Sequence, residues 1–181
     1  TTDELVENLK ETEYYAPLKK IKDTDNVTLY DYNLALDLYY YTSTWKEQKK
    51  ILKKSDLELF MRDRGSKIDL LNIQWIYRAK KYYNMKPADI YLMLIPIHYK
   101  LSTELVKDMV EAPGVEEFEN VVIRTTYARH YNFKQNLTME QMYADCLHHL
   151  YTADRRKNPY SVSAINTYLF LKEEEIKKLT T

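Results

Sequence analysis

Three features of the sequence predict an all-α fold. Glycine occurs only twice in 181 residues, against a usual share of roughly 7%, so few residues are suited to tight turns. At residues 28–31, 55–58 and 138–141 a Ser or Thr is followed three positions later by Asp, Glu or Gln, which is the spacing of a capping box. Between these helix starts, apolar residues recur at the helical period. We therefore expect long antiparallel helical hairpins.

The first long helix is expected from residue 28 to about residue 52. Thr28 caps it, with Asp31 three positions further on, and apolar residues follow at positions 34, 38, 41 and 45. Such a helix is roughly 40 Å long, at about 1.5 Å per residue. The second capping box, at Ser55 and Glu58, places a turn at residues 53–56 and returns the chain to about residue 83. Residues 28–83 are thus predicted to form an αα-hairpin.

The second helix of this hairpin carries an apolar stripe at helical spacing. Its members are Leu57, Met61, Ile68, Leu71, Trp75 and Tyr82. We expect the stripe to pack on the first helix, with Trp45, Leu71 and Trp75 largely buried at the contact. Gly65 is a candidate for a break in this helix, because glycine costs about 1 kcal/mol relative to alanine in a helix interior.

After such a break, Ser66 and Asp69 have the spacing to restart the helix, and Asn84 suits the C′ position that ends it. Pro87 fits the first position of a short helix that ends near residue 94, and Pro96 then requires an extended exit.

Ser102 is expected to cap a helix through residue 111, and the turn at residues 113–114 precedes another short helix at 115–124. Residues 125–136 are expected to be an irregular loop. Thr138 then opens a helix to about residue 156, Pro159 interrupts it, and Ser161 caps the last helix. Residues 138–179 are predicted to form a second hairpin.

We accordingly expect a first helical-hairpin domain at residues 1–100 and a second helical region at residues 101–181. The first residue is not Met, and no cap residue follows the last helix. We therefore expect the chain to be an excised piece of a longer subunit.

The composition restricts the class of protein. Lys and Arg together number 27, as do Asp and Glu, and a net charge of zero argues against a dedicated surface for nucleic acid or anionic membrane. Cys146 has no second cysteine for a disulfide, and no apolar run reaches the roughly 18 residues that span a bilayer. We expect a soluble chain of a reducing compartment, without a signal peptide.

Few residues indicate chemistry. Cys146 and His149 lie one helical turn apart and could be zinc ligands, but one helix supplies too few of them, so packing or surface roles are favoured. His98 could act as a base, yet no Ser or Cys nucleophile accompanies it. Gly65 and Gly114 stand alone, which excludes the phosphate-binding loops of Walker and dinucleotide type. We therefore expect no catalytic site, no metal and no cofactor.

Aromatic and basic clusters raise the possibility of nucleic-acid binding. Tyrosines at residues 39–41 and 82–83 could stack on bases beside Arg78, Lys80 and Lys81, but their helical spacing favours core or groove positions with a solvated hydroxyl. A run of lysines at residues 46, 49, 50, 53 and 54 could meet phosphate. It also suits the last turns of a helix, where cations complement the dipole, and we favour a solvated face.

Three motifs resemble those of one known family. The central motif reads Asp69-x-x-Asn72-Ile73, then Tyr77-Arg78-Ala79-Lys80, then Ile95-Pro96-x-x-Tyr99-x-Leu101. An earlier motif is Ala35-Leu36-Asp37-Leu38-Tyr39-Tyr40, and a later one is Asn158-Pro159-Tyr160-Ser161 followed by Tyr168-Leu169-x-Leu171-Lys172-Glu173. In this order the motifs resemble the central-stalk subunit of V-type ATPases, which is called C in bacteria and archaea and d in eukaryotes.

The resemblance implies a function that the residues alone do not. In that family the subunit joins the rotor shaft of the soluble ATPase head to the membrane ring of ion-carrying subunits, and it hydrolyses nothing itself. It also implies repeated all-helical domains around a pseudo-threefold axis, in keeping with a weak echo between residues 35–40 and 144–149. Asp69, Asn72 and Arg78 would belong to a helix-packing motif, with Asp69 and Asn72 hydrogen-bonded in the interior. The implied location is peripheral, on the cytoplasmic face of the membrane.

Two other classes remain open. One is an unrelated all-helical scaffold for protein interactions, which a sustained 34-residue period would favour; no such period is found. The other is a helical enzyme with a site near His98 and His130, which would require titratable groups clustered in a pocket.

Overall fold

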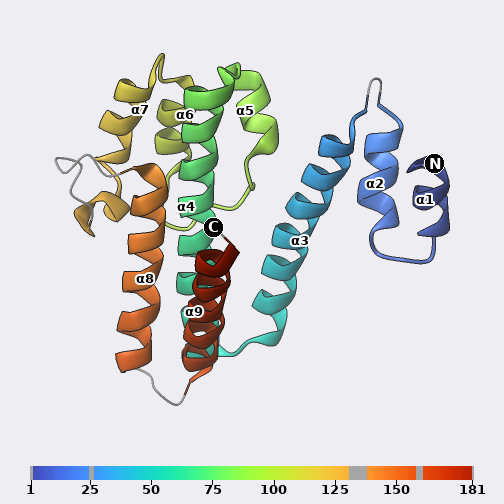
Figure 1. Ribbon diagram of the computed structural model, residues 1–181. Helices are drawn as coiled ribbons and strands as arrows, with labels where there is room; N and C mark the ends of the chain where they lie inside the picture. Colours follow the sequence, from blue (N-terminus) through green and yellow to red (C-terminus); the bar gives the residue numbers. More distant parts are fainter. Residues whose placement is uncertain (1, 25–26, 131–137, 158–160, 181) are drawn as a thin grey trace. The chain divides into compact units, whose positions relative to one another are not determined.

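The computed structural model describes residues 2–24, 27–130, 138–157 and 161–180 (Figure 1). In those ranges all of the regular secondary structure is helical, with nine α-helices, one short 3-10 helix and no strand. They are α1 (Thr2–Asn8), α2 (Tyr15–Lys22), α3 (Leu29–Ile51), α4 (Lys54–Tyr83), α5 (Pro87–Met93), α6 (Thr103–Glu111), α7 (Val115–Val122), η1 (Thr126–His130), α8 (Met139–Lys157) and α9 (Val162–Thr180). The predicted all-α class is confirmed.

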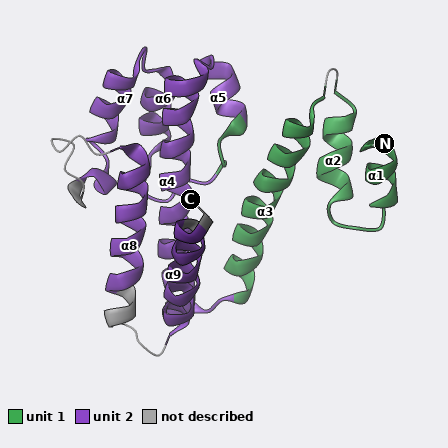
Figure 2. Cartoon of the chain, in the orientation of Figure 1, with its two compact units in different colours: residues 1–51, 93–96 green, residues 52–92, 97–181 purple. Residues whose placement is uncertain are grey.

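The chain divides into two compact units (Figure 2). Unit 1 comprises residues 1–51 with 93–96, and unit 2 comprises residues 52–92 with 97–181. The predicted hairpin at residues 28–83 has its two helices in different units, since α3 is in unit 1 and α4 is in unit 2. The pairing of α3 with α4 and the domain boundary near residue 100 therefore stay predictions.

Beside the predicted long helix α3, unit 1 contains two short helices that the sequence did not predict. No helix was expected before residue 28, yet α1 and α2 both precede it, and α2 packs on α1 and on α3. Val6 and Leu18 are their buried apolar side chains, and Lys22 donates a hydrogen bond to Glu7 at 3.3 Å. This unit therefore rests on a small core.

The start of α3 agrees with the predicted capping box. Thr28 donates to one carboxylate oxygen of Asp31 from its backbone N–H at 2.8 Å and from its hydroxyl at 2.6 Å. These bonds hold the pKa of Asp31 below its usual value. Further along α3, no described residue is buried, and Trp45 is half-buried. The expected burial of Trp45 against α4 involves the other unit and therefore stays a prediction.

Helix α4 is the centre of unit 2 and packs on α6, α7, α8 and α9. The largest fully buried apolar side chains of these helices are Ile68, Leu70, Ile73 and Ile76 of α4, Met109 and Val110 of α6, Phe118 of α7, and Met142 and Leu147 of α8. Because these helices surround α4, they bury more than one of its faces.

Of the predicted stripe, only Ile68 is among the buried residues of α4. Leu71 and Trp75 are half-buried and Tyr82 is exposed, whereas Ile73 and Ile76 are buried together with polar residues that the stripe left out. The predicted contact of Leu71 and Trp75 with α3 joins the two units, so their burial at that contact stays a prediction. Several helices contact α4, so one seam does not describe its packing.

The ends of α4 show which local signals held. Lys53, not Ser55, is the N-cap residue, with an extended backbone and no side-chain cap bond, and Ser55 lies inside the first turn. The helix is continuous through Gly65, so the expected break was wrong. Asn84 adopts the left-handed conformation (φ 45°, ψ 43°), as predicted, and the Met85 N–H donates to the Ala79 carbonyl at 3.1 Å.

The caps of the later helices were predicted correctly. The Ser102 hydroxyl accepts from the Leu105 N–H at 3.2 Å at the start of α6. Thr138 and Gln141 form a reciprocal capping box at the start of α8, and the Ser161 hydroxyl accepts from the Ser163 N–H at 3.2 Å at the start of α9.

Helices α8 and α9 pack on each other. The expected interruption at residues 158–159 lies outside the described residues. Part of the loop expected at 125–136 is the 3-10 helix η1, and residues 131–136 of it also lie outside.

Candidate functional site

The side chain of Asp69 accepts hydrogen bonds from two separate segments of unit 2. It is fully buried on α4, and its carboxylate accepts four hydrogen bonds. Three come from consecutive backbone N–H groups, of Tyr99 at 3.1 Å, Lys100 at 2.7 Å and Leu101 at 3.2 Å, and the fourth comes from the Tyr127 hydroxyl at 2.7 Å. Bonds to a charged acceptor are stronger than neutral ones. Asp69 therefore holds the connection between α5 and α6, together with η1, against the middle of α4.

Tyr127 is a partner that the sequence analysis missed. It is buried in η1, and burial, followed by the neighbouring carboxylate of Asp69, raises the pKa of its hydroxyl above the usual value. The hydroxyl is therefore a neutral donor at physiological pH. Its separation of 58 residues from Asp69 explains the omission, because no local spacing rule links the two positions.

Gly65 permits the close approach of this connection to α4. A Cβ atom at position 65 would lie 2.7 Å from both Cβ and Cγ of Tyr99, which is closer than real carbon atoms pack. The Tyr99 N–H is in turn fixed by Asp69, one turn further along α4. Gly65 is thus required for contact with the connection, and it is not a helix breaker.

The three residues assigned to the family motif occupy different environments. Asp69 and Asn72 are both fully buried, which supports the expected interior role. Arg78 is exposed, and at about 100° per residue it lies on the opposite side of α4 from Asp69. The structure therefore does not bring Arg78 together with the other two, and its part in the motif stays a proposal.

Lys80 ties α4 to the end of α6. Its ammonium group donates to the carbonyls of Val110 at 2.7 Å and Ala112 at 2.6 Å, which are among the last carbonyls of that helix. A cation at a helix C-terminus satisfies these acceptors and complements the dipole. Partial burial lowers the pKa of Lys80 from its usual value. The ammonium group of Lys80 is thus engaged within the fold.

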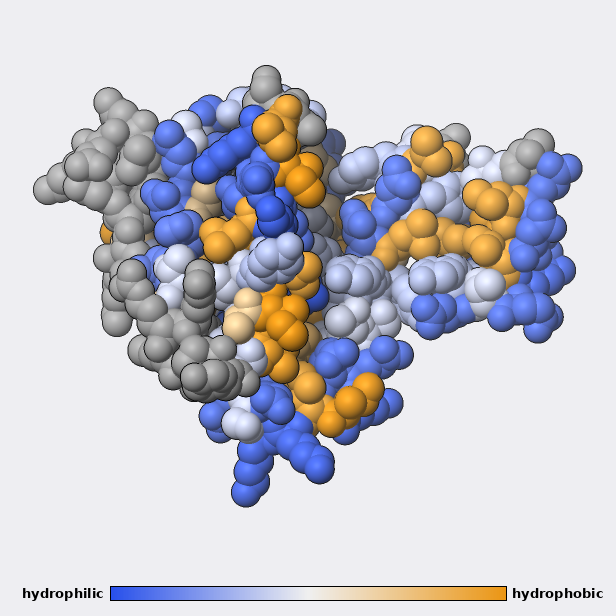
Figure 3. Space-filling view, turned by 60° about the horizontal axis from the view of Figure 1, so that its bottom comes forward, coloured by the Kyte–Doolittle hydropathy of each residue, from blue (hydrophilic) through white to orange (hydrophobic). Residues whose placement is uncertain are grey.

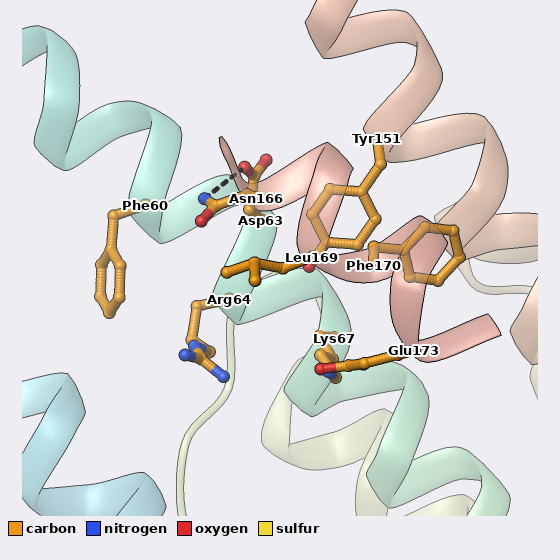
Figure 4. Close-up of a pocket in the computed structure, with 9 residues that line it drawn as sticks. All are labelled: Phe60, Asp63, Arg64, Lys67, Tyr151, Asn166, Leu169, Phe170 and Glu173. Carbon is orange, nitrogen blue, oxygen red and sulfur yellow. Dashed lines mark hydrogen bonds and ion pairs between the residues drawn. The ribbon is translucent and has the colours of Figure 1, made fainter. Parts of the chain in front are cut away.

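A cavity of about 110 Å³ lies among α4, α8 and α9 (Figure 4). The rings of Tyr151 and Phe170 stack at 4.8 Å on one side of it. Asn166 donates to the buried Asp63 at 3.4 Å on another side, and Lys67 lies 3.5 Å from Glu173. The cavity therefore combines aromatic walls with charged groups, and its residues come from three helices of one unit.

Two further hollows lie elsewhere, one in each unit. Between α8 and α9, a hollow of about 320 Å³ is lined by Asp145, His148 and Glu174 among others. In unit 1, a groove of about 500 Å³ among α1, α2 and α3 is lined mostly by apolar side chains such as Leu5, Leu29 and Tyr40. Figure 3 shows that hydrophobic side chains gather in separate patches between hydrophilic ones on the face that it presents.

The two candidate zinc ligands, Cys146 and His149, lie in different environments. Cys146 is buried, its thiol donates to the Tyr127 carbonyl at 3.6 Å, and burial raises the pKa of the thiol to about 11. His149 is exposed, as is His98. Over the ranges that the structure describes, no group of three or more His, Cys, Asp or Glu residues is placed to hold a metal ion. The side chain of His130 is not among those that the structure describes.

The tyrosine and lysine clusters are divided between environments. Tyr82 and Tyr83 are exposed, Tyr39 and Tyr41 are half-buried, and the lysines at residues 46–54 are exposed.

Among the described helices, none combines the length and apolar character needed to cross a membrane.

Comparison with known proteins identifies relatives of the chain. A family model described as "ATP synthase (C/AC39) subunit" matches residues 1–181. The C subunit of the A-type ATP synthase of Methanosarcina mazei is 32% identical over 127 residues, which are 70% of this chain and 33% of that protein. The chain thus spans about a third of the length of this curated relative. No solved structure matches the chain.

Proposed function

The chain belongs to the ATP synthase (C/AC39) subunit family, and from that premise we propose that it is a non-catalytic part of the central stalk of a rotary ATPase. In this role it joins the rotor shaft of the soluble head to the membrane ring of ion-carrying subunits. The observation that carries the proposal is the family match over all 181 residues. The similarity to a subunit of an A-type ATP synthase supports it.

The construction of unit 2 suits the transmission of torque. A coupling element must resist bending and shear, and dense packing with satisfied polar groups gives low compliance. Asp69 fixes the α5–α6 connection and η1 to α4 through four hydrogen bonds, and Lys80 fixes the end of α6 to the same helix. Load applied to one of these elements is therefore shared with α4.

We propose that the chain is peripheral to the cytoplasmic face of the membrane and that it contacts the shaft and the ring mainly through polar groups. The even balance of acidic and basic residues fits partners of mixed charge. The competing idea of an unrelated helical scaffold is disfavoured by the family match. No specific observation favours the helical enzyme.

Association with the shaft tests this function. We expect the purified chain to retain the rotor-shaft subunits of the same organism at low salt and to lose them as salt rises, because polar contacts between exposed charges are screened. An unrelated helical protein of similar size and zero net charge is the control for nonspecific retention.

The same preparation should hydrolyse no ATP above the level of a blank. The helical circular-dichroism spectrum must be verified before each assay. A correctly folded chain that retains no shaft subunit even at low salt would contradict the proposed coupling role.

A further inference from the structure

The C-terminal end of α4 carries several cations and no carboxylate. Residues 70–88 include four Lys or Arg side chains and no Asp or Glu. Lys80 is engaged with carbonyls of α6, which leaves Arg78, Lys81 and Lys86, and all three are exposed. In the part of the chain that the structure describes, none of these three forms an ion pair. Their charge is therefore not offset within unit 2.

Two exposed tyrosines lie beside these cations. Tyr82 is 58% exposed and Tyr83 is 65% exposed. Arg78 precedes Lys81 by three positions and Tyr82 by four, so the three are neighbours on one side of α4. This side faces away from Asp69, because nine residues at about 100° each amount to half a turn. We call the whole group the basic end of α4: Arg78, Lys81, Tyr82, Tyr83 and Lys86.

Aromatic rings hold the ammonium group of Lys81 in place. It donates a hydrogen bond to the hydroxyl of the buried Tyr77, and it lies 4.9 Å from the centre of the Tyr77 ring and 5.4 Å from that of Tyr82. The bond to Tyr77 raises the pKa of Lys81, so the group is charged at physiological pH. None of these contacts is with a carboxylate. Lys81 is thus a positioned cation, which loses less conformational freedom on binding than a mobile one.

The helix terminus accounts for only part of this charge. The dipole of an α-helix places about half an elementary negative charge at its C-terminus, and the three cations exceed that. Asp89 is the first carboxylate after the basic end, three positions beyond Lys86 at the start of α5, and no ion pair joins these two described residues. A carboxylate from another molecule would therefore find cations that are still available.

The number and kind of side chains select the class of partner. Polybasic segments that bind anionic membranes have about four to eight Lys or Arg residues, and tight binding to nucleic acid uses roughly six to ten phosphate contacts. The basic end has three cations. Arg and Tyr are enriched in protein–protein interfaces and among the residues that carry most of their binding energy. This composition favours an acidic protein segment.

We propose that the basic end of α4 docks an acidic segment of a partner protein. One carboxylate of the segment accepts two hydrogen bonds from the planar guanidinium of Arg78, which matches carboxylate geometry, and a second lies against Lys81. An apolar or aromatic side chain of the segment packs on the rings of Tyr82 and Tyr83. This contact goes beyond the coupling role proposed above, which rests on family membership and assigns no surface of unit 2 to a partner.

A peptide titration followed by NMR tests the contact. The nitrogen-15 labelled chain is titrated at low salt with a short synthetic peptide in which glutamates flank a tryptophan, and separately with the same peptide carrying glutamine for every glutamate. We expect the acidic peptide to bind about tenfold more tightly or better and to shift the Arg78 side-chain N–H and the backbone amides of residues 78–86. Rising salt should weaken this binding, because exposed charges are screened.

Substitutions separate the basic end from general electrostatic attraction. Arg78→Glu should weaken binding of the acidic peptide by about tenfold or more. Lys107→Glu is the matched control, because Lys107 is an exposed cation on α6 of the same unit and the change in net charge is the same; it should leave affinity within about twofold. Arg78→Lys keeps the charge but loses the fork, so it should give an intermediate affinity.

Three results would overturn the proposal. The first is that Lys107→Glu weakens binding as much as Arg78→Glu. The second is that the amide shifts are spread over the exposed lysines of the chain and are not concentrated at residues 78–86. The third is that phosphatidylserine vesicles or a single-stranded oligonucleotide bind at the basic end more tightly than the peptide does, because the partner is then of another class. None of these results depends on retention of the shaft subunits, so failure here is distinct from failure of the coupling role.

Discussion

At the scale of single residues, the buried carboxylate of Asp69 accepts four hydrogen bonds, so a change of one atom in it should weaken unit 2. Replacement by Asn keeps the shape but removes the charge and directs an amide donor at groups that are themselves donors. We expect Asp69→Asn to lower the free energy of unfolding by about 2–3 kcal/mol, since buried N–H groups of the connection lose their acceptor.

Chemical denaturation monitored by circular dichroism measures this change. Asp145→Asn is the matched control, because Asp145 is an exposed carboxylate on α8 of the same unit, and surface substitutions of this kind usually stay within about 0.5 kcal/mol. Equal effects of the two substitutions would mean that the four bonds to Asp69 contribute little.

Ionisation of Tyr127 should make the free energy of unfolding fall as pH rises in the alkaline range. Its pKa is raised in the folded chain by burial and by Asp69, so its neutral form is favoured in the native state. Its contribution is fully present below the unfolded pKa of about 10 and is lost as pH rises above that value. We expect Tyr127→Phe to abolish a slope of up to about 1.4 kcal/mol per pH unit in this range.

The difference between wild type and Tyr127→Phe isolates one tyrosine among eighteen. Both proteins should be denatured at a series of pH values from neutral to above 10. If the free energies of unfolding of the two proteins change with pH in parallel, Tyr127 has the same pKa in the folded and the unfolded chain.

At the scale of elements, the contact between α4 and the α5–α6 connection depends on Gly65. Alanine in a helix interior is normally favoured over glycine by about 1 kcal/mol, but here the added Cβ would meet Tyr99 at 2.7 Å. Overpacking of this kind costs about 1–3 kcal/mol, so we expect Gly65→Ala to destabilise unit 2. In a Tyr99→Gly background the same change should become neutral or stabilising.

Gly114→Ala is a fitting control for Gly65→Ala. A Cβ at position 114 would meet the carboxylate end of Glu117, which is a flexible group that can move away. Thermal unfolding of the single and double variants supplies the coupling energy. A Gly65→Ala protein that is more stable than wild type would show that the connection moves away easily.

Local rules predicted most helix starts, although not that of α4, and they did not predict which faces are buried. The caps at Thr28, Ser102, Thr138 and Ser161 depend on residues two or three positions away, so spacing alone identifies them. The absence of glycine-rich turns similarly predicted the all-α class. Spacing does not contain the direction from which other helices approach, and for that reason the burial of Ile73 and Ile76 in α4 was not predicted.

The candidate site shows the same limit. Asp69 and Asn72 were selected from the sequence, and both are fully buried. Tyr127 was not selected, because its bond to Asp69 joins an irregular segment to a helix 58 positions away. Gly65 was noticed for its helix propensity, while its actual role follows from the approach of Tyr99.

At the scale of the whole molecule, the two units should differ in local stability. Unit 2 has a contiguous apolar core drawn from α4, α6, α7 and α8, whereas α3, the longest helix of unit 1, has no buried residue in its described length. Most helical stability in proteins comes from packing of an apolar face rather than from propensity. Amides of α3 are therefore expected to open more easily than those of α4.

Hydrogen exchange followed by mass spectrometry tests this expectation. Peptides covering residues 68–77 of α4 should exchange only through global opening of unit 2, and those covering residues 34–48 of α3 should exchange through local opening at a markedly lower free energy. Asp69→Asn is an internal check, since it should accelerate exchange in α4 and leave α3 unchanged. If the amides of α3 exchange as slowly as those of α4 in the isolated chain, the packing of α3 must be more extensive than unit 1 supplies. If they exchange quickly in the isolated chain and slowly with the shaft subunits present, binding protects α3, and unit 1 then carries the coupling contact.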